Sequence, residues 1–228
     1  MELERKIPAF KDKLVVSEHD RSMQEENETA GTNRLFELKA DDRFVIREPE
    51  GTFVENEELK DPIAFVNKSK ALLAELTEKY GILCPVHFVV AKDETDTPKA
   101  FILTEKVKSV DYETLDPNEK QNAARQIQAI FESLMKYYEG KERTRAEFLW
   151  DVPQLQQFVY GMLPTDSENK WYLVDTDQYS AKSSEKLFEA AETLEAELFE
   201  LEDTFGINVS SLEKRCGQMM KRLENADW

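Results

Sequence analysis

Residues 147–179 read EFLWDVPQLQQFVYGMLPTDSENKWYLVDTDQY, and the rest of the chain can be arranged around this stretch. Two of its segments, Phe158–Tyr160 and Trp171–Val174, are short, apolar and rich in aromatic residues, which is typical of buried strands. A proline and several polar residues fill the connection over 164–170, where a turn is expected. The stretch therefore predicts a β-hairpin in the second half of the chain.

Three aspartates stand at the ends of the predicted hairpin strands. Asp151 precedes the first strand, and Asp175 and Asp177 follow the second. Carboxylates at the ends of buried strands commonly hold divalent metals and the phosphates bound to them, because burial makes an unpaired charge costly. Aspartate at such positions also serves ordinary turns and helix caps. The three residues are the principal candidates for a functional site, with purely structural turns as the alternative.

The composition predicts a folded, strongly acidic protein. The chain has 228 residues, of which 40% are hydrophobic and 10% aromatic, enough to build the core of one large domain or of two small lobes. Its 47 acidic residues against 30 basic residues give a formal charge of −17. Such a field repels nucleic acid and anionic membranes, and no long run of lysine and arginine offsets it. We expect neither nucleic acid nor a membrane as a partner.

The cysteines and histidines are too few and too scattered for a zinc site. Cys84 and Cys216 lie far apart without a Cys-x-x-Cys pair, and the histidines are His19 and His87. Both cysteines have apolar neighbours, so we expect buried, reduced thiols. The N-terminus MELERKIPAFKDK has no apolar signal core, and no apolar run approaches the length of a membrane span. These features predict a cytoplasmic protein.

The first part of the chain predicts a small sheet with one helix. Residues 1–33 form a polar segment, and 34–107 form a β-rich lobe with patterns in the order β-β-α-β-β. The Asp41-Asp42 pair suits a hairpin turn, and Asp61-Pro62 suits a helix start. The predicted elements are the strands Arg34–Ala40 and Arg43–Glu48, the helix Asp61–Tyr80, and the strands Cys84–Ala91 and Lys99–Thr104.

Residues 108–228 are predicted to be mostly helical around the central hairpin. The segment 116–119, Asp-Pro-Asn-Glu, combines a helix cap, a proline and a capping-box glutamate, and helical spacing then continues to Gly140. A helix over Ser184–Phe205 carries a leucine stripe on an acidic background, and a last helix begins at Ser210. The stripe is expected to pack on the same chain, with partner binding as the alternative. Together the halves predict an α+β protein whose two lobes divide near residue 107.

This order of elements resembles that of the protein-kinase-like fold, from near residue 30 to near residue 215. The segment 171–175, Trp-Tyr-Leu-Val-Asp, is similar to the family's strand that ends in a metal-binding aspartate, with Thr-Asp following in place of Phe-Gly. The other matching segments are the third strand (Arg43–Glu48), the helix behind it (Asp61–Tyr80), the strand into the hinge (Phe101–Val107), the helix before the catalytic loop (Asn118–Tyr138) and that loop (Asp151–Gln156). The resemblance implies a two-lobed kinase-like fold.

The resemblance also implies roles for four residues of the hairpin region. Asp151 would accept the proton of the substrate hydroxyl, and Asp175 would hold magnesium. Gln156 stands five positions after Asp151, where the family has an asparagine that supports a metal ion, and Asp177 would be a further metal ligand. These assignments imply ATP and magnesium as cofactors.

In the β-rich lobe the resemblance implies three residues for the nucleotide. Arg47 lies on the predicted third strand, where the family has its phosphate-binding lysine. Glu105 and Val107 lie on the segment that leads into the hinge, and the resemblance implies that they contact the nucleotide.

The sequence departs from the kinase pattern where phosphates would be held. No glycine-rich loop precedes the first strands, since 29–33 read Thr-Ala-Gly-Thr-Asn, and Arg47 replaces lysine. Asn67, Lys68 and Lys70 occupy the region of the helix where a pairing glutamate is expected, and Glu75 comes a turn too late. Leucine and tryptophan precede the catalytic-loop aspartate instead of histidine and arginine, and glutamine for asparagine lengthens the metal ligand by a methylene.

We therefore expect a catalytically weakened or inactive kinase-like protein that acts by binding a protein partner. The first alternative is an active small-molecule phosphotransferase that uses ATP and magnesium. The second is an unrelated acidic interaction domain, in which the hairpin aspartates have only structural roles.

Overall fold

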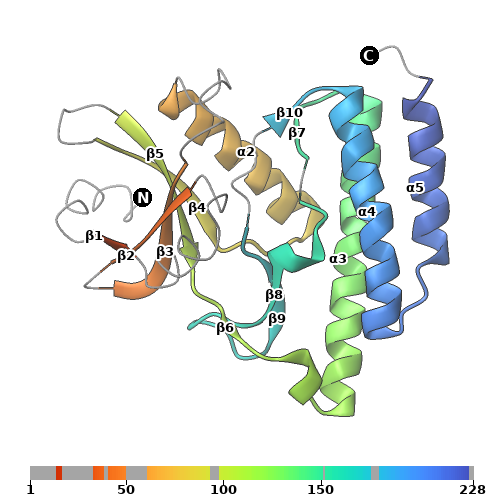
Figure 1. Cartoon of the computed structure of the whole chain (residues 1–228), viewed down its shortest axis with the longest axis horizontal. Helices are drawn as coiled ribbons and strands as arrows, with labels where there is room; N and C mark the ends of the chain where they lie inside the picture. Colours follow the sequence, from red (N-terminus) through yellow and green to blue (C-terminus); the bar gives the residue numbers. More distant parts are fainter. Residues whose placement is uncertain are drawn as a thin grey trace, which may run out of the picture. The chain divides into compact units, whose positions relative to one another are not determined.

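A computed structural model describes residues 14–16, 33–38, 41–49, 61–92, 98–150, 152–175 and 180–225 (Figure 1). These residues form helices and small antiparallel sheets, which confirms the predicted α+β class. Within this part of the chain, none of the helices has both the length and the apolar character needed to cross a bilayer. The helices are α2 (Pro62–Tyr80), α3 (Pro117–Thr144), α4 (Ser184–Phe205) and α5 (Ser210–Leu223).

A five-stranded antiparallel sheet has the strand order β1-β2-β3-β5-β4 (Figure 1). Its strands are β1 (Leu14–Val16), β2 (Asn33–Leu38), β3 (Asp41–Pro49), β4 (Val86–Lys92) and β5 (Pro98–Glu105). The prediction of a turn at Asp41-Asp42 is wrong, because both residues belong to β3 and Asp41 pairs with Leu38 across the ladder. The turn chemistry of the two aspartates is overridden by strand pairing.

The chain divides into two compact units, and each unit is built from two separate segments of the sequence. The first comprises residues 1–71 and 85–106, and the second comprises 72–84 and 107–228. The first half of α2 thus belongs to the unit with the five-stranded sheet, and its second half to the helical unit. The sequence predicts the whole of this helix within the β-rich lobe.

In the first unit, apolar side chains from β4, β5 and the start of α2 form the core. The centre of β5 is buried at four successive residues, Ala100 to Leu103, so both faces of this strand are covered. Phe65 of α2 meets Phe88 of β4 edge to face, with 6.0 Å between the ring centroids. The first half of α2 therefore packs on the sheet through an aromatic pair.

In the second unit, α3 starts as predicted and ends later. The Asp116 side chain accepts hydrogen bonds from the backbone of Asn118 and Glu119, which completes the capping box. The prediction that Gly140 ends this helix is wrong, since α3 continues to Thr144 and Arg145 caps it with a φ of 53°. Gly140 instead allows a close approach, because a Cβ there would lie 3.0 Å from the hydroxyl of Tyr80.

The leucine stripe of α4 faces the interior of the second unit. Leu187, Leu194, Leu198 and Leu201 are fully buried, and α4 lies against both α3 and α5 (Figure 1). The predicted packing of the stripe on the same chain is therefore confirmed. Gly206 ends α4 with a φ of 64°, a conformation that glycine adopts without strain.

Short strands complete the second unit, and several of them were not predicted. The hairpin appears as predicted, and a third strand pairs with it to give the order β6-β8-β9, while β7 pairs with β10. These strands are β6 (Lys108–Ser109), β7 (Phe148–Leu149), β8 (Phe158–Met162), β9 (Lys170–Leu173) and β10 (Ser180–Ala181).

Neither Cys84 nor Cys216 forms a disulfide, as expected, but the burial of the two side chains differs. Cys216 is fully buried and its Sγ lies 3.4 Å from the sulfur of Met135. Burial raises the pKa of the Cys216 thiol to about 12, which makes it unreactive at neutral pH. Cys84 is only half-buried.

Candidate functional site

The β8–β9 hairpin brings two of the predicted site residues to one end. The last strand pair of the ladder is Phe158 with Leu173, and one further hydrogen bond of 2.9 Å joins the Val174 nitrogen to the Gln157 carbonyl oxygen. Gln156 and Asp175 directly flank this bond along their two segments. We call Gln156, Gln157, Val174 and Asp175 the hairpin end, and it brings the backbone positions of Gln156 and Asp175 to the same end of the two strands.

Amide and carboxylate oxygen atoms are the ligands that magnesium prefers. Asp175 is half-buried, whereas Gln156 is exposed and donates from its amide to the side chain of Gln154 at 2.8 Å. Within the described ranges no group of three or more histidine, cysteine or acidic side chains gathers around a possible metal position. Asp151 and Asp177, the other two aspartates assigned to the site, lie outside the described residues.

Gln157 is not among the site residues predicted from the sequence, although it is next to the predicted metal ligand Gln156. Its side chain is 5% exposed, and its Oε1 atom is buried without a hydrogen-bond partner. A buried acceptor of this kind calls for a donor such as an ordered water or a ligand hydroxyl. No pattern in the run of glutamines distinguishes this residue from Gln156, because the contrast in burial arises from tertiary packing.

Gln156 and Gln157 allow a matched test of the buried oxygen that has no hydrogen-bond partner. We expect Gln157→Met to raise the free energy of unfolding by about 1 kcal/mol, because methionine removes a buried oxygen that makes no hydrogen bond. Gln156→Met, at an exposed position, should leave stability nearly unchanged. Urea denaturation of the two variants measures the difference. A loss of stability in Gln157→Met would mean that a bound water already satisfies the oxygen.

The backbone of β7, just before the predicted catalytic loop, is held by two tyrosines of α3. The Tyr137 hydroxyl accepts from the Leu149 nitrogen at 3.0 Å, and the Tyr138 hydroxyl donates to the Leu149 carbonyl oxygen at 3.2 Å. Both tyrosines are fully buried, and burial raises the pKa of Tyr137 far above its usual range. The backbone of Leu149, two residues before Asp151, is therefore held in place by α3.

After Asp151 the chain is held by α4. The Leu155 nitrogen donates to the Glu197 carboxylate at 2.9 Å, and Val152 and Pro153 are buried. Burial raises the pKa of Glu197, and the hydrogen bond from Leu155 partly offsets the rise. The loop that would carry catalysis is thus anchored on both sides to helices of its own unit.

The three residues assigned to a nucleotide fall in different units. Arg47 of β3 lies opposite Ile102 of β5 in the first unit and is buried. Glu105, at the end of β5 in the same unit, lies 3.3 Å from the His87 ring nitrogen. Val107 belongs to the second unit, where its Cγ1 faces Gly161 of β8.

The acidic residues of α2 lie only in its second half. Residues 62–71, the part in the first unit, contain Lys68 and Lys70 but no aspartate or glutamate. Glu75, in the second unit, accepts a hydrogen bond of 2.5 Å from the ammonium group of Lys141 on α3. Glu75 is therefore engaged with α3, and the other glutamate of this helix, Glu78, is exposed in the same second half.

Comparisons with known proteins leave the family open. No protein-family model and no curated protein matches this sequence. A function for this chain is therefore inferred from the order of its elements and from the chemistry of the residues just described.

Proposed function

We propose that this chain is a kinase-like protein with weakened or absent catalysis, which acts by binding a protein partner. The strand order β1-β2-β3-β5-β4, with α2 inserted between β3 and β4, supports kinase-like ancestry. In the second unit, the long helix α3, the short strand β7 and the β8–β9 hairpin follow in the order that the resemblance implies.

The observation that carries the proposal is the distribution of charge along α2. Active protein kinases require an ion pair between a strand lysine and a glutamate of the helix behind it. Here the part of α2 in the unit of Arg47 has two lysines and no carboxylate, and Glu75 binds Lys141 in the other unit. The part of the helix in the first unit therefore provides no glutamate for such a pair, which supports a loss of phosphate positioning.

The exposed face of α4 supports partner binding. Phe199 is 67% exposed, which is unusual for so large an apolar side chain. Exposed carboxylates surround it at helical spacing: Glu192, Glu195, Glu202 and Asp203. An aromatic anchor within a negative field favours a partner whose surface is basic and carries an apolar residue.

A nucleotide titration tests the loss of catalysis. We expect no ATP hydrolysis and no phosphate transfer above the buffer rate in the presence of magnesium, because the part of α2 in the first unit carries no glutamate for the positioning ion pair. Any rise in melting temperature with ATP and magnesium should disappear in Asp175→Ala and persist in Asp203→Ala, an exposed aspartate on α4. ATP hydrolysis that Asp151→Ala abolishes would overturn the proposal and establish the active phosphotransferase.

A separate pair of variants addresses the partner. Capture of a protein partner should be lost in Phe199→Ser and retained in Ile63→Ser, which removes another exposed apolar side chain, 54% exposed, from α2. Equal capture by both variants would remove α4 as the binding face.

The active phosphotransferase remains the second candidate because Gln156 and Asp175, two of the proposed metal ligands, lie at the same end of the hairpin. The unrelated acidic interaction domain makes the opposite prediction for nucleotide. It requires that ATP and magnesium leave the melting temperature unchanged at every concentration while partner capture persists.

A further inference from the structure

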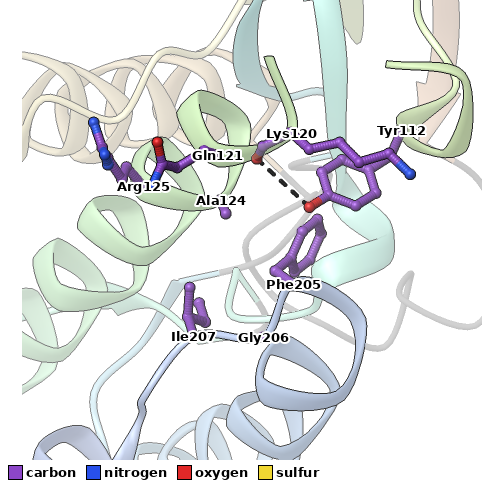
Figure 2. A pocket seen from close by; sticks show the side chains of 8 residues that line it. All are labelled: Tyr112, Lys120, Gln121, Ala124, Arg125, Phe205, Gly206 and Ile207. Atoms are coloured by element: carbon purple, nitrogen blue, oxygen red, sulfur yellow. Dashed lines mark hydrogen bonds between the residues drawn. The ribbon is translucent and has the colours of Figure 1, made fainter. Parts of the chain in front are cut away.

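The second unit contains a pocket that shares no residue with the hairpin end. It has a volume of about 390 Å³ and opens between the start of α3 and the turn that joins α4 to α5 (Figure 2). Its lining residues are Tyr112, Lys120, Gln121, Ala124, Arg125, Phe205, Gly206 and Ile207. Pockets of this size accept small organic molecules.

The polar side of the pocket is cationic, although the chain as a whole is strongly acidic. Lys120 and Arg125 line the pocket and no carboxylate does, although the chain carries −17. The Lys120 ammonium lies 3.1 Å from the Glu113 carboxylate and is therefore neutralised locally. Arg125 is exposed and makes no ion pair with any carboxylate in the described ranges. The Arg125 guanidinium therefore gives the pocket a net positive charge.

The other side of the pocket is aromatic and apolar. Tyr112 and Phe205 meet edge to face with 4.8 Å between their centroids, and the Tyr112 hydroxyl donates to the Lys120 carbonyl oxygen at 3.5 Å. Figure 2 shows these rings on one side of the pocket and Arg125 with Gln121 on the other. Ring edges and faces of this kind pack well against a further aromatic ring.

We infer that this pocket binds a small aromatic anion, such as an aromatic carboxylate. The ring of the ligand would pack against Tyr112 and Phe205, and its carboxylate would accept hydrogen bonds from Arg125 and the Gln121 amide. The inference goes beyond the proposed function, because it assigns a ligand class to a site that neither ATP nor a protein partner requires.

A natural reporter lies directly behind the pocket. The indole N–H of Trp171 donates to the Ala123 carbonyl oxygen at 2.9 Å, and Ala123 precedes Ala124 of the lining. The Trp171 ring also lies 5.7 Å from that of Phe205, and it is 7% exposed. A ring current from a bound ligand should therefore shift the Trp171 indole N–H resonance.

The test titrates the full chain with naphthoate and follows that resonance by NMR, with Trp171→Phe to assign it. We expect a saturable shift, and Arg125→Gln should raise the Kd roughly fivefold by removing the charge that faces the carboxylate. Lys136→Gln removes an exposed cation from the same helix away from the pocket, and should leave the Kd unchanged. Naphthalenemethanol, which has the same rings without the charge, should bind more weakly than naphthoate.

Two results would overturn the inference. One is the absence of any saturable shift at millimolar naphthoate. The other is equal binding of naphthoate and naphthalenemethanol with the same Kd for wild type and Arg125→Gln, which would make the pocket a plain apolar site. Arg125→Gln should fold normally, since the side chain is exposed, and circular dichroism checks this.

Discussion

Glu75→Gln is expected to lower the free energy of unfolding by about 3 kcal/mol, because it leaves the ammonium group of Lys141 buried without a carboxylate. The Lys141 side chain is only 5% exposed, and its Nζ lies 2.5 Å from the Glu75 carboxylate and 5.0 Å from the Tyr137 ring centroid. The aromatic ring can offset part of the loss but cannot replace a full negative charge. Urea denaturation at neutral pH measures the difference.

A double variant and a neighbouring lysine separate burial from surface charge. Glu75→Leu combined with Lys141→Met removes both charges, and most of the lost stability should return. Lys79 approaches the same carboxylate at 3.5 Å but is 64% exposed, so Lys79→Met should lower stability by no more than about 0.5 kcal/mol. If Glu75→Gln has as small an effect as Lys79→Met, the pair contributes no more than a surface ion pair.

Gly161→Ala is expected to lower the free energy of unfolding by about 3 kcal/mol, through a backbone collision. A Cβ at this position would lie 2.2 Å from the Lys108 carbonyl oxygen and 2.9 Å from Cγ1 of Val107. Since the obstacle is backbone, β6 has to move away from β8, and the pairing of Ser109 with Gly161 is lost. Hydrogen exchange should show faster exchange at the Val110 amide, which donates to the Tyr160 carbonyl oxygen at 2.9 Å.

Gly217 supplies the matched control for this substitution. It lies inside α5, and the nearest atom to a Cβ there is a Glu195 carboxylate oxygen at 3.9 Å. Gly217→Ala should therefore raise the free energy of unfolding by about 0.5 kcal/mol, because alanine favours the helix. Destabilisation by both substitutions would point to a general effect of alanine rather than to the contact between β6 and β8.

The elements that could be predicted are those with local signals. The capping box at Asp116 begins α3 as expected, and the left-handed Gly206 ends α4. The aromatic runs around 158–160 and 171–174 form the hairpin. Gly140 shows the limit of such signals. It reads as a helix end, yet α3 continues past it, and what the missing side chain permits is the approach of Tyr80, 60 residues away by numbering.

The site could be predicted in outline only. The hairpin brings Gln156 and Asp175 to one end because strand pairing follows the local pattern. Burial of Gln157 beside the exposed Gln156 depends on how the loop packs, and so does the ion pair between Glu75 and Lys141, which are 66 residues apart. A single sequence carries no local signal for the burial of Gln157 or for the ion pair between Glu75 and Lys141.

The division of α2 between the two units has a consequence for how the protein can be taken apart. The chain passes from one unit to the other at 71/72, at 84/85 and again at 106/107. No single proteolytic nick or gene truncation can therefore release either unit intact. A fragment that stops at Lys106 would contain Leu76 and Ile82, both fully buried in the native chain, without the rest of their unit.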